Sequence, residues 1–109
     1  MNQGDIVIAD YPFSSLKQSK IRPAVIVSNE RFNKGEDIIL VPVTTVGDGQ
    51  YRSKISTDAL EEGYLTRESY IHYSNLFTME KRLIMQKVAK LKPTLISDLI
   101  DNISKNFRA

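Results

Sequence analysis

Two polar side chains stand at the ends of apolar runs, where a rigid scaffold can hold them beside loops. Arg22 immediately precedes the run at 23–28, and Thr44 follows the run at 38–43. The arginine side chain carries a permanent charge and five donors in a fixed fork, which match a phosphate or a pentavalent phosphorane. The pattern equally suits an arginine that pairs with a surface carboxylate or an aromatic ring, and a threonine that closes a turn.

His72 is the only histidine and lies in the β-branched and aromatic segment 69–75. Strand alternation there places Tyr70, His72 and Ser74 on one face, so the imidazole shares that face with hydroxyl groups. Histidine exchanges a proton near neutral pH, which makes His72 the natural general acid or base of a reaction centre. The alternative is a structural imidazole held by hydrogen bonds.

Basic residues gather in two stretches that contain no acidic residue, at 11–29 and 81–97. The first contains Lys17 and Lys20 besides Arg22, and the two stretches together would line a groove for a phosphate chain. Aromatic residues near the expected loops would stack bases in such a groove. They are Tyr11, Phe13 and Tyr51. The alternative is that the rings complete a small core and the lysines keep an exposed face hydrated.

Short strands followed by one helix must position these residues. β-branched runs separated by turn residues predict the strands, and apolar residues at three- and four-residue spacing after Pro93 predict an amphipathic C-terminal helix. Pro42 lacks an N–H, which predicts a bulge or an edge position within its strand. The pattern predicts one mainly β (α+β) domain over residues 1–109, a small, strongly curved barrel with the helix packed on it. The strands are expected at 5–10, 24–28, 37–45, 51–56 (an edge strand), 69–75 and 83–91, with a helical turn at 58–61 and a turn at 78–81.

The composition excludes several kinds of site. The 109 residues include no cysteine and one histidine, which excludes disulfides, thiolate zinc sites, a cysteine nucleophile and an all-protein histidine cluster. The net charge of +2 is too small to prove a polyanionic partner. No metal motif, phosphate-cradling glycine loop or Ser-His-Asp signature is present, and we expect neither a metal nor a cofactor. The start of the chain does not resemble a signal peptide, and no apolar run approaches about 20 residues, so we expect a cytoplasmic protein.

Three segments in order resemble the PemK/MazF family of bacterial toxins. They are GDIVIADYPFSSLKQSKIRPAVIVSN, DIILVPVTT and SYIHYSNLFTMEKRLIMQKVAKLKP, which together cover nearly the whole chain. The most specific parts are Lys20-Ile21-Arg22-Pro23 with the apolar strand that follows, and Val41-Pro42-Val43-Thr44 downstream of it.

This resemblance implies an SH3-like barrel of the PemK/MazF type that forms a homodimer. It implies a sequence-specific endoribonuclease that cleaves single-stranded RNA, including mRNA, without metal, by attack of the substrate's own 2′-hydroxyl. It also implies a cognate antitoxin whose flexible tail fills the RNA groove. The family's catalytic arginine and threonine correspond to Arg22 and Thr44, and His72 is the candidate base. The residues expected to bind RNA are Tyr11, Phe13, Lys17, Lys20, Thr45, Tyr51 and Ser74.

The chain departs from the family pattern in the segment 70–74. Many relatives carry an arginine where this chain has His72 and an acidic residue where it has Ser74. Three alternatives therefore stay open: a catalytically weakened module that binds RNA or a partner, a relative that poisons a protein target such as a topoisomerase, and a structural interaction domain. RNA binding without cleavage would identify the first, and the second does not need the pair Arg22 and Thr44.

Overall fold

The computed structural model describes residues 1–12 and 19–109, with side chains at 1–10 and 21–109. Eight strands, two helices and two 3-10 turns make up this part of the chain. In chain order they are β1 (Asp5–Pro12), β2 (Ser19–Ile26), α1 (Glu30–Asn33), β3 (Asp37–Thr44), β4 (Arg52–Ile55), η1 (Thr57–Ala59), β5 (Leu60–Gly63), β6 (Ser69–His72), β7 (Phe77–Glu80), η2 (Lys81–Leu83), β8 (Ile84–Leu91) and α2 (Pro93–Lys105).

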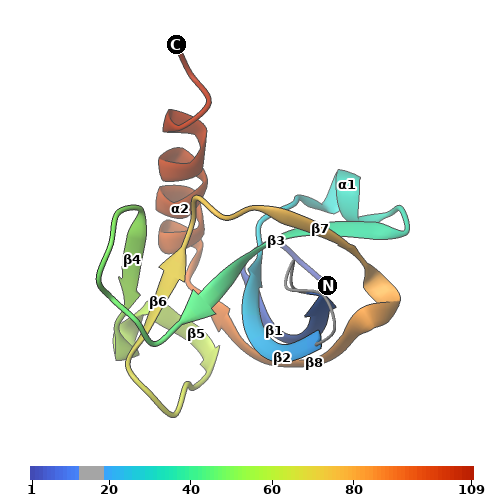
Figure 1. The fold of residues 1–109 in the computed structure, drawn as a ribbon, viewed down its shortest axis with the longest axis horizontal. Coiled ribbons are helices and arrows are strands. Elements are labelled where there is room, and N and C mark those ends of the chain that lie inside the picture. Colours follow the sequence, from blue (N-terminus) through green and yellow to red (C-terminus); the bar gives the residue numbers. More distant parts are fainter. Residues whose placement is uncertain (13–18) are drawn as a thin grey trace.

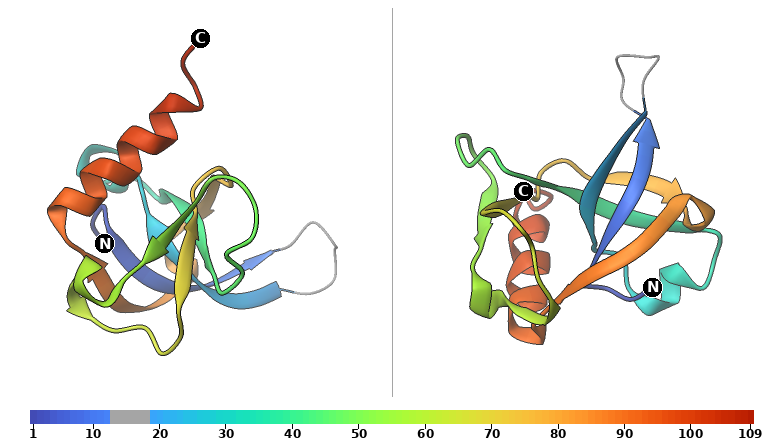
Figure 2. Two further views of the ribbon diagram at one scale, coloured as in Figure 1. Left: turned by 90° about the vertical axis from the view of Figure 1, so that its left-hand side faces the viewer. Right: turned by 90° about the horizontal axis from the view of Figure 1, so that it is seen from below.

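The strands form one antiparallel sheet in the order β4-β6-β3-β2-β1-β8-β5, and β7 pairs with β3 outside this path. Figure 1 shows β1, β2, β3, β7 and β8 curling around one half of the molecule, with β4, β5 and β6 in the other half beside α2. The two further views show the strong curl and the diagonal course of α2 (Figure 2). The predicted curved, mainly β fold with one C-terminal helix is confirmed.

The curled sheet has a core on each of its faces. The core of the first face lies against α2 and includes Val25, Val41, Val43, Ile71 and Leu99. The second core lies inside the curl and consists of Val7, Ala9, Ala24, Ile26, Ile38, Leu40 and Met79. Because successive side chains of a strand alternate between faces, the central strands are apolar on both sides. This explains the continuous apolar runs in β2 and β3.

Strand β2 begins five residues earlier than the predicted 24–28, because its start pairs with the end of β1. Ala9, Asp10 and Tyr11 are the partners of Arg22, Ile21 and Lys20. Arg22 therefore lies within a strand rather than at the mouth of one.

β6 and β7 run one after the other along the same side of β3. Val43 pairs with Ile71 and Leu40 pairs with Phe77, so three steps along β3 correspond to six along its partner. The three extra residues lie between Ile71 and Phe77, where the chain bulges out of the ladder through a turn at 73–74, and Pro42 of β3 lies opposite this bulge, where no ladder needs its missing N–H. The bulge expected from Pro42 is thus present on the neighbouring strand, although β3 itself is an interior strand.

Two local predictions are wrong. The turn expected at 78–81 is largely β7, because pairing with Asp37–Leu40 of β3 holds it extended, and the turn follows as η2. The helical turn expected at 58–61 is the 3-10 turn η1 at 57–59, and β5 follows it directly because its residues pair with β8.

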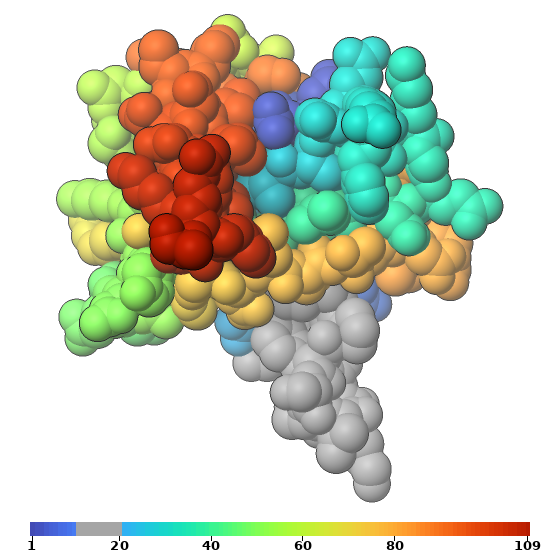
Figure 3. All heavy atoms as spheres, turned by 90° about the horizontal axis from the view of Figure 1, so that it is seen from above, coloured from blue at the N-terminus to red at the C-terminus, as the bar shows by residue number. Residues whose placement is uncertain are grey.

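The C-terminal helix agrees with the periodicity of its sequence. α2 has Pro93 in its first turn and buries Leu99 and Ile103 against the sheet. In the space-filling view, the N-terminal residues lie between α2 and the α1 segment (Figure 3). Within the described part of the chain, α2 and α1 are both too short or too polar to span a membrane.

Candidate functional site

Polar side chains from four neighbouring strands share one face of the sheet. Thr44 of β3 pairs with Tyr70 of β6, and His72 of β6 pairs with Arg52 of β4. Directly paired residues of an antiparallel ladder point to the same face, and alternation puts Tyr70 and His72 together. The opposite face of these strands carries the apolar core that packs on α2. The sheet therefore presents a polar surface where the second core ends.

Arg22 joins this surface from β2. Ala24 pairs with Pro42, and continuing the same register by two residues brings Arg22 opposite Thr44. Alternation places Arg22 on the face of Ala24, which is fully buried in the second core. The guanidinium is half-buried at the edge of that core. The arginine and the threonine singled out by sequence are thus neighbours across two paired strands.

Thr44 ends β3 and closes a turn. The backbone N–H of Val46 donates to Thr44 Oγ1 over 3.1 Å. The turn role considered from sequence is therefore present, but it uses the hydroxyl only as an acceptor. A hydroxyl that accepts one bond keeps its own proton to donate, so Thr44 can also bind an anionic oxygen.

His72 ends β6 and is half-buried. Burial lowers the pKa of its imidazole, and the positive charge of Arg52 across the ladder lowers it further. Both effects disfavour the protonated form. His72 is therefore neutral near pH 7 and offers a ring nitrogen that can accept a proton.

The loop between β3 and β4 packs over this surface. A Cβ at Gly47 would lie 2.6 Å from the Tyr70 ring, and a Cβ at Gly49 would lie 2.6 Å from Nη1 of Arg52. The loop can approach both side chains closely because glycine stands at both positions. Gly49 also has φ +116°, a conformation that other residues rarely adopt.

Tyr70 is held at this surface by hydrogen bonding. Its hydroxyl donates to Glu68 over 2.6 Å, and this bond raises the pKa of Tyr70 and lowers that of Glu68. Lys54 of β4 lies 3.5 Å from the same carboxylate. Tyr70 therefore keeps its proton at neutral pH and serves as a fixed wall of the site.

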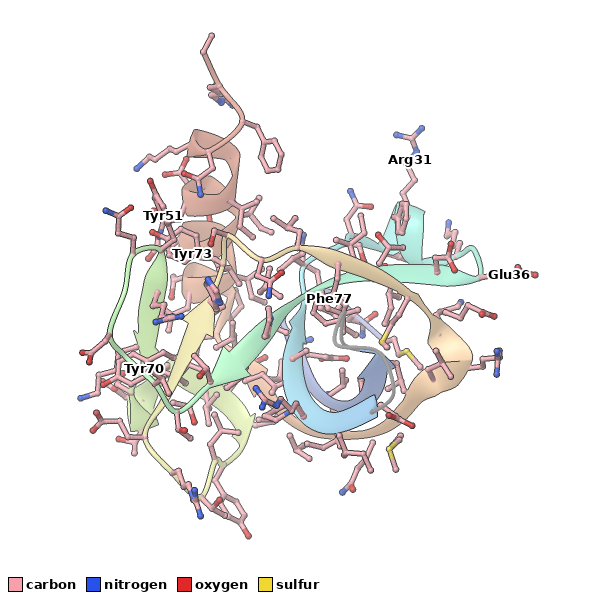
Figure 4. All side chains as sticks on the ribbon, in the orientation of Figure 1. Arg31, Glu36, Tyr51, Tyr70, Tyr73 and Phe77 are labelled. Atoms are coloured by element: carbon pink, nitrogen blue, oxygen red, sulfur yellow. The ribbon has the colours of Figure 1, made fainter. Side chains whose placement is uncertain are left out.

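Tyr51 precedes β4 in a left-handed conformation with φ 61°. The backbone N–H of Tyr73 donates to the Tyr51 carbonyl over 3.0 Å, and the two rings meet edge to face with centroids 6.1 Å apart. Figure 4 shows the pair beside α2 at one end of β4 and β6. The Tyr51 side chain is 46% exposed, which leaves ring surface for a ligand.

The other residues predicted to bind RNA have different positions. Thr45 and Ser74 are exposed just beyond the ends of β3 and β6, so Ser74 does not continue the strand face of His72 as expected. The strand ends at His72 because the bulge begins there. Tyr11 and Lys20 pair through their backbones in β1 and β2, and their side chains lie outside the described residues. Lys17 and Phe13 lie wholly outside them.

Sequence reasoning found Arg22, Thr44 and His72 but missed Arg52 and Tyr70 as members of the site. The signal for Tyr70 was its alternation with His72. Arg52 lies in the predicted edge strand, and only the register with β6 shows that it stands opposite the histidine. Among the described residues, no three His, Asp or Glu side chains gather closely enough to hold a metal ion.

Known proteins that resemble the chain agree on one group. A family model described as PemK-like, MazF-like toxin of type II toxin-antitoxin system matches residues 2–107. The endoribonuclease MazF of Staphylococcus epidermidis is 28% identical over 106 residues, which cover 94% of this chain and 86% of that protein.

Solved structures share the fold at low sequence identity. An endoribonuclease in complex with its cognate antitoxin from a mycobacterial species has a TM-score of 0.77 at 17% identity, covering 98% of this chain and 94% of that one. MazF of Deinococcus radiodurans has a TM-score of 0.77 at 14% identity, covering 98% and 96%. At these identities the similarity shows a common fold.

Proposed function

The chain belongs to the PemK-like, MazF-like toxins of type II toxin–antitoxin systems, and from this premise we propose that it is a metal-independent endoribonuclease. Its substrate is single-stranded RNA, including mRNA, which it cuts at a short recognition sequence. The name of the Staphylococcus epidermidis relative supports the activity. The observation that carries the proposal is the gathering of Arg22, Thr44 and His72 on one face of the sheet.

In the proposed reaction the substrate supplies its own nucleophile. The 2′-oxygen of one nucleotide attacks the adjacent phosphorus, and His72 accepts the 2′-hydroxyl proton. The bond from phosphorus to the 5′-oxygen breaks, and that oxygen takes a proton from water. The products are a 2′,3′-cyclic phosphate and a free 5′-hydroxyl, so the protein forms no covalent bond with RNA.

Arg22 and Thr44 stabilise the phosphorane in this scheme. The guanidinium offers two parallel N–H groups to its charged oxygens, and its high pKa makes it a stabiliser of charge rather than a proton donor. Thr44 donates its hydroxyl proton to a phosphate oxygen or to the attacking group and thereby orients the reaction. Such preorganised donors act most strongly where the transition state carries more charge than the substrate.

The proposal includes two protein partners. The mycobacterial relative was solved with its cognate antitoxin, which supports a cognate antitoxin for this chain as well. We further propose that the chain acts as a homodimer in the cytoplasm, where its RNA substrate is found. Light scattering after gel filtration tests the dimer, and a single monomer mass at micromolar concentration would contradict it.

The function is tested by incubating the purified protein with mixed single-stranded RNA in the presence of a chelator and mapping the new 5′-hydroxyl ends. We expect cuts within one short sequence. Arg22→Ala should reduce the rate by about a hundred- to a thousandfold, because it removes a principal electrostatic donor. Arg31→Ala is the matched control, since Arg31 is exposed on α1, away from the site (Figure 4).

Two results would contradict the proposal. If RNA is bound but stays intact, the protein is a binding module on the same fold. If cleavage requires a divalent cation, the 2′-hydroxyl mechanism without metal is wrong.

A further inference from the structure

We propose that Arg52 binds a second phosphate of the RNA, in addition to the phosphate that Arg22 and Thr44 engage, and thereby positions the substrate across β4 and β6. This inference rests on the proposed function and adds to it a residue that sequence reasoning did not select. Arg52 is assigned as a positioning residue, because the bond that breaks lies at the other phosphate.

The first observation is that Arg52 is a half-buried cation without an anion. Its Nε is buried and has no hydrogen-bond partner, and Arg52 makes no ion pair with the described residues. Five other basic side chains do have carboxylate partners within 4 Å. They are Lys54 with Glu68, Arg82 with Glu80, Lys87 with Glu62 and Asp5, Lys90 with Asp5, and Lys105 with Asp101.

Partial burial of an unpaired guanidinium is costly, because the group loses water without gaining an opposite charge. Such a cost is commonly recovered when a ligand brings the missing charge, as at sites built for anions. An anion that binds Arg52 would therefore contact a guanidinium that has already lost part of its hydration.

The second observation is that the β3–β4 loop is shaped around this guanidinium. Gly49 approaches Nη1 so closely that a Cβ would lie 2.6 Å away, and its φ of +116° favours glycine. The loop therefore lies directly against the guanidinium of Arg52. A preorganised fork loses less conformational entropy on binding than an exposed lysine does.

The third observation is the position of Arg52 relative to the reaction centre. It pairs directly with His72, and His72 stands on the same strand face as Tyr70, the partner of Thr44. The groups thus follow one another across β2, β3, β6 and β4. Because β2 and β4 are three strand spacings apart, about 14 Å, a single strand of RNA laid across these strands would bring different, non-adjacent phosphates to Arg22 and Arg52.

The exposed ring of Tyr51 supports RNA as the ligand rather than an isolated anion. Tyr51 precedes Arg52 directly, and the edge-to-face contact with Tyr73 fixes its orientation. An aromatic face beside an arginine fork is the combination that binds single-stranded nucleic acid, since the base stacks while the phosphate pairs. Inorganic phosphate offers only the second contact.

The test compares Arg52→Gln and Arg52→Lys with the wild-type protein. The ligand is a labelled single-stranded oligonucleotide of the cleaved sequence with deoxyribose at the cleaved position, or throughout if no cleavage occurs. Fluorescence anisotropy gives Kd across a range of salt concentrations. Arg52→Gln should weaken Kd about tenfold and lower the magnitude of the salt slope by about 0.7, the value for one phosphate contact with a single strand.

Arg52→Lys should retain the salt slope, because it keeps the charge, while its Kd weakens through loss of the two-pronged fork. Arg31→Gln is the matched control: it removes the same kind of side chain from an exposed position on α1, outside both basic stretches. That variant should leave Kd within about twofold and the slope unchanged, because distant surface charges are screened. Wild-type values of Kd and slope for Arg52→Gln would overturn the inference.

A measurement on the wild-type protein covers the case in which the variants do not fold. Phenylglyoxal modifies accessible arginines, and mass spectrometry of the peptides identifies them. The oligonucleotide should protect Arg52 at least about fivefold more than Arg31, the exposed reference on α1. Equal protection of the two arginines would also overturn the inference.

Failure of the inference and failure of the proposed function give different results. If Arg52→Gln binds and cleaves like the wild type, the ribonuclease stands and Arg52 has no role in it. If the wild type binds but does not cleave, the function is wrong, while loss of binding in Arg52→Gln still supports the phosphate contact. If the wild type neither binds nor cleaves, both proposals are wrong. Inorganic phosphate is tested in the same protection experiment. If it protects Arg52 as well as the oligonucleotide does at the same phosphate concentration, Arg52 belongs to a simple anion site instead.

Discussion

At the scale of single residues, the protonation of His72 should determine how the rate depends on pH. Burial and Arg52 both lower its pKa, so the neutral form persists below the ordinary value of about 6.5. The charged group that faces it is Arg52 on β4. On the same face, Tyr70 donates its hydroxyl to Glu68, and the β3 partner of Tyr70, Thr44, is uncharged.

A general base must be deprotonated, so we expect the cleavage rate to rise with pH through the His72 pKa and to level off above it. The rising limb should lie on the acid side of about pH 6.5 and should move to higher pH in Arg52→Gln, which removes a positive charge. Because the chain has one histidine, its imidazole proton resonance gives the same pKa directly by NMR. A rate that stays flat through the pH at which NMR shows the imidazole titrating would exclude His72 as the base.

Thr44 offers a test of whether its hydroxyl serves more than the turn. Thr44→Val keeps the shape but removes the donor, and we expect a loss of about a hundredfold in kcat. It also leaves the Val46 N–H without its acceptor. Thr44→Ser restores the hydroxyl and should recover most of the rate. Equal losses in both variants, with unchanged thermal stability, would show that the hydroxyl alone does not account for the role of Thr44, and a wild-type rate in Thr44→Val would show that the hydroxyl is not needed.

Residue type and position made Arg22, Thr44 and His72 candidates, and the resemblance to the PemK/MazF family selected Arg22 and Thr44 among the polar residues at strand ends. The sequence could not identify Arg52, whose importance depends on which residue of β6 stands opposite. One step of register would have placed Arg52 beside Ile71 or Tyr73 instead of His72.

At the scale of elements, Gly63 fixes how β5 meets β8. It has φ +75°, and a Cβ there would lie 2.1 Å from the carbonyl oxygen of Val88 and 2.7 Å from Cα of Ala89. Both contacts are with backbone, which cannot move aside cheaply. We expect Gly63→Ala to lower the free energy of unfolding by about 2 kcal/mol or more, measured by urea titration.

Gly35→Ala is the control for this prediction. Its nearest heavy atom would be the Phe32 carbonyl oxygen at 3.5 Å, an ordinary contact, and its φ lies outside the left-handed region. We expect a change within about 0.5 kcal/mol. Equal effects at the two glycines would mean that the β5–β8 pairing does not depend on the close approach at Gly63.

Most strands and the C-terminal helix could be predicted from the local sequence, because β-branched strands and an amphipathic helix have clear periodicities. The exceptions were β5, which begins within the helical turn expected at 58–61, and β7. The sequence of β7, Phe77-Thr78-Met79-Glu80, is compatible with a turn, and it is a strand because four residues of β3 pair with it. Only the tertiary partner decides between the two conformations.

At the scale of the whole molecule, the second core supports the site from within the curl. Leu40 is fully buried there, on the strand that ends at Thr44. Leu40→Ala should lower the free energy of unfolding by about 2–5 kcal/mol, because the cavity adds to the lost burial. Urea titration followed by circular dichroism measures it, with exposed Ile21→Ala as a control expected to change by about 0.5 kcal/mol or less.

A small loss of stability in Leu40→Ala would mean that the strands of the curl relax to fill the space.

The general shape of the molecule was expected from the sequence, since short strands in so short a chain bury enough area only by curling. The packing of two separate cores on one sheet was not expected, because strands that are apolar on both faces do not show which neighbours cover each face.

The proline opposite the bulge also has a consequence for motion. β3 pairs with β2 along one edge. Along its other edge it pairs separately with β6 after Pro42 and with β7 before Pro42. The sheet can therefore open at β6 while β7 stays closed, and hydrogen exchange of backbone amides should fall into two groups with different opening free energies. The group that contains β6 and β4 carries His72 and Arg52, so this division would let the surface proposed to bind RNA open without exposing the interior of the curl.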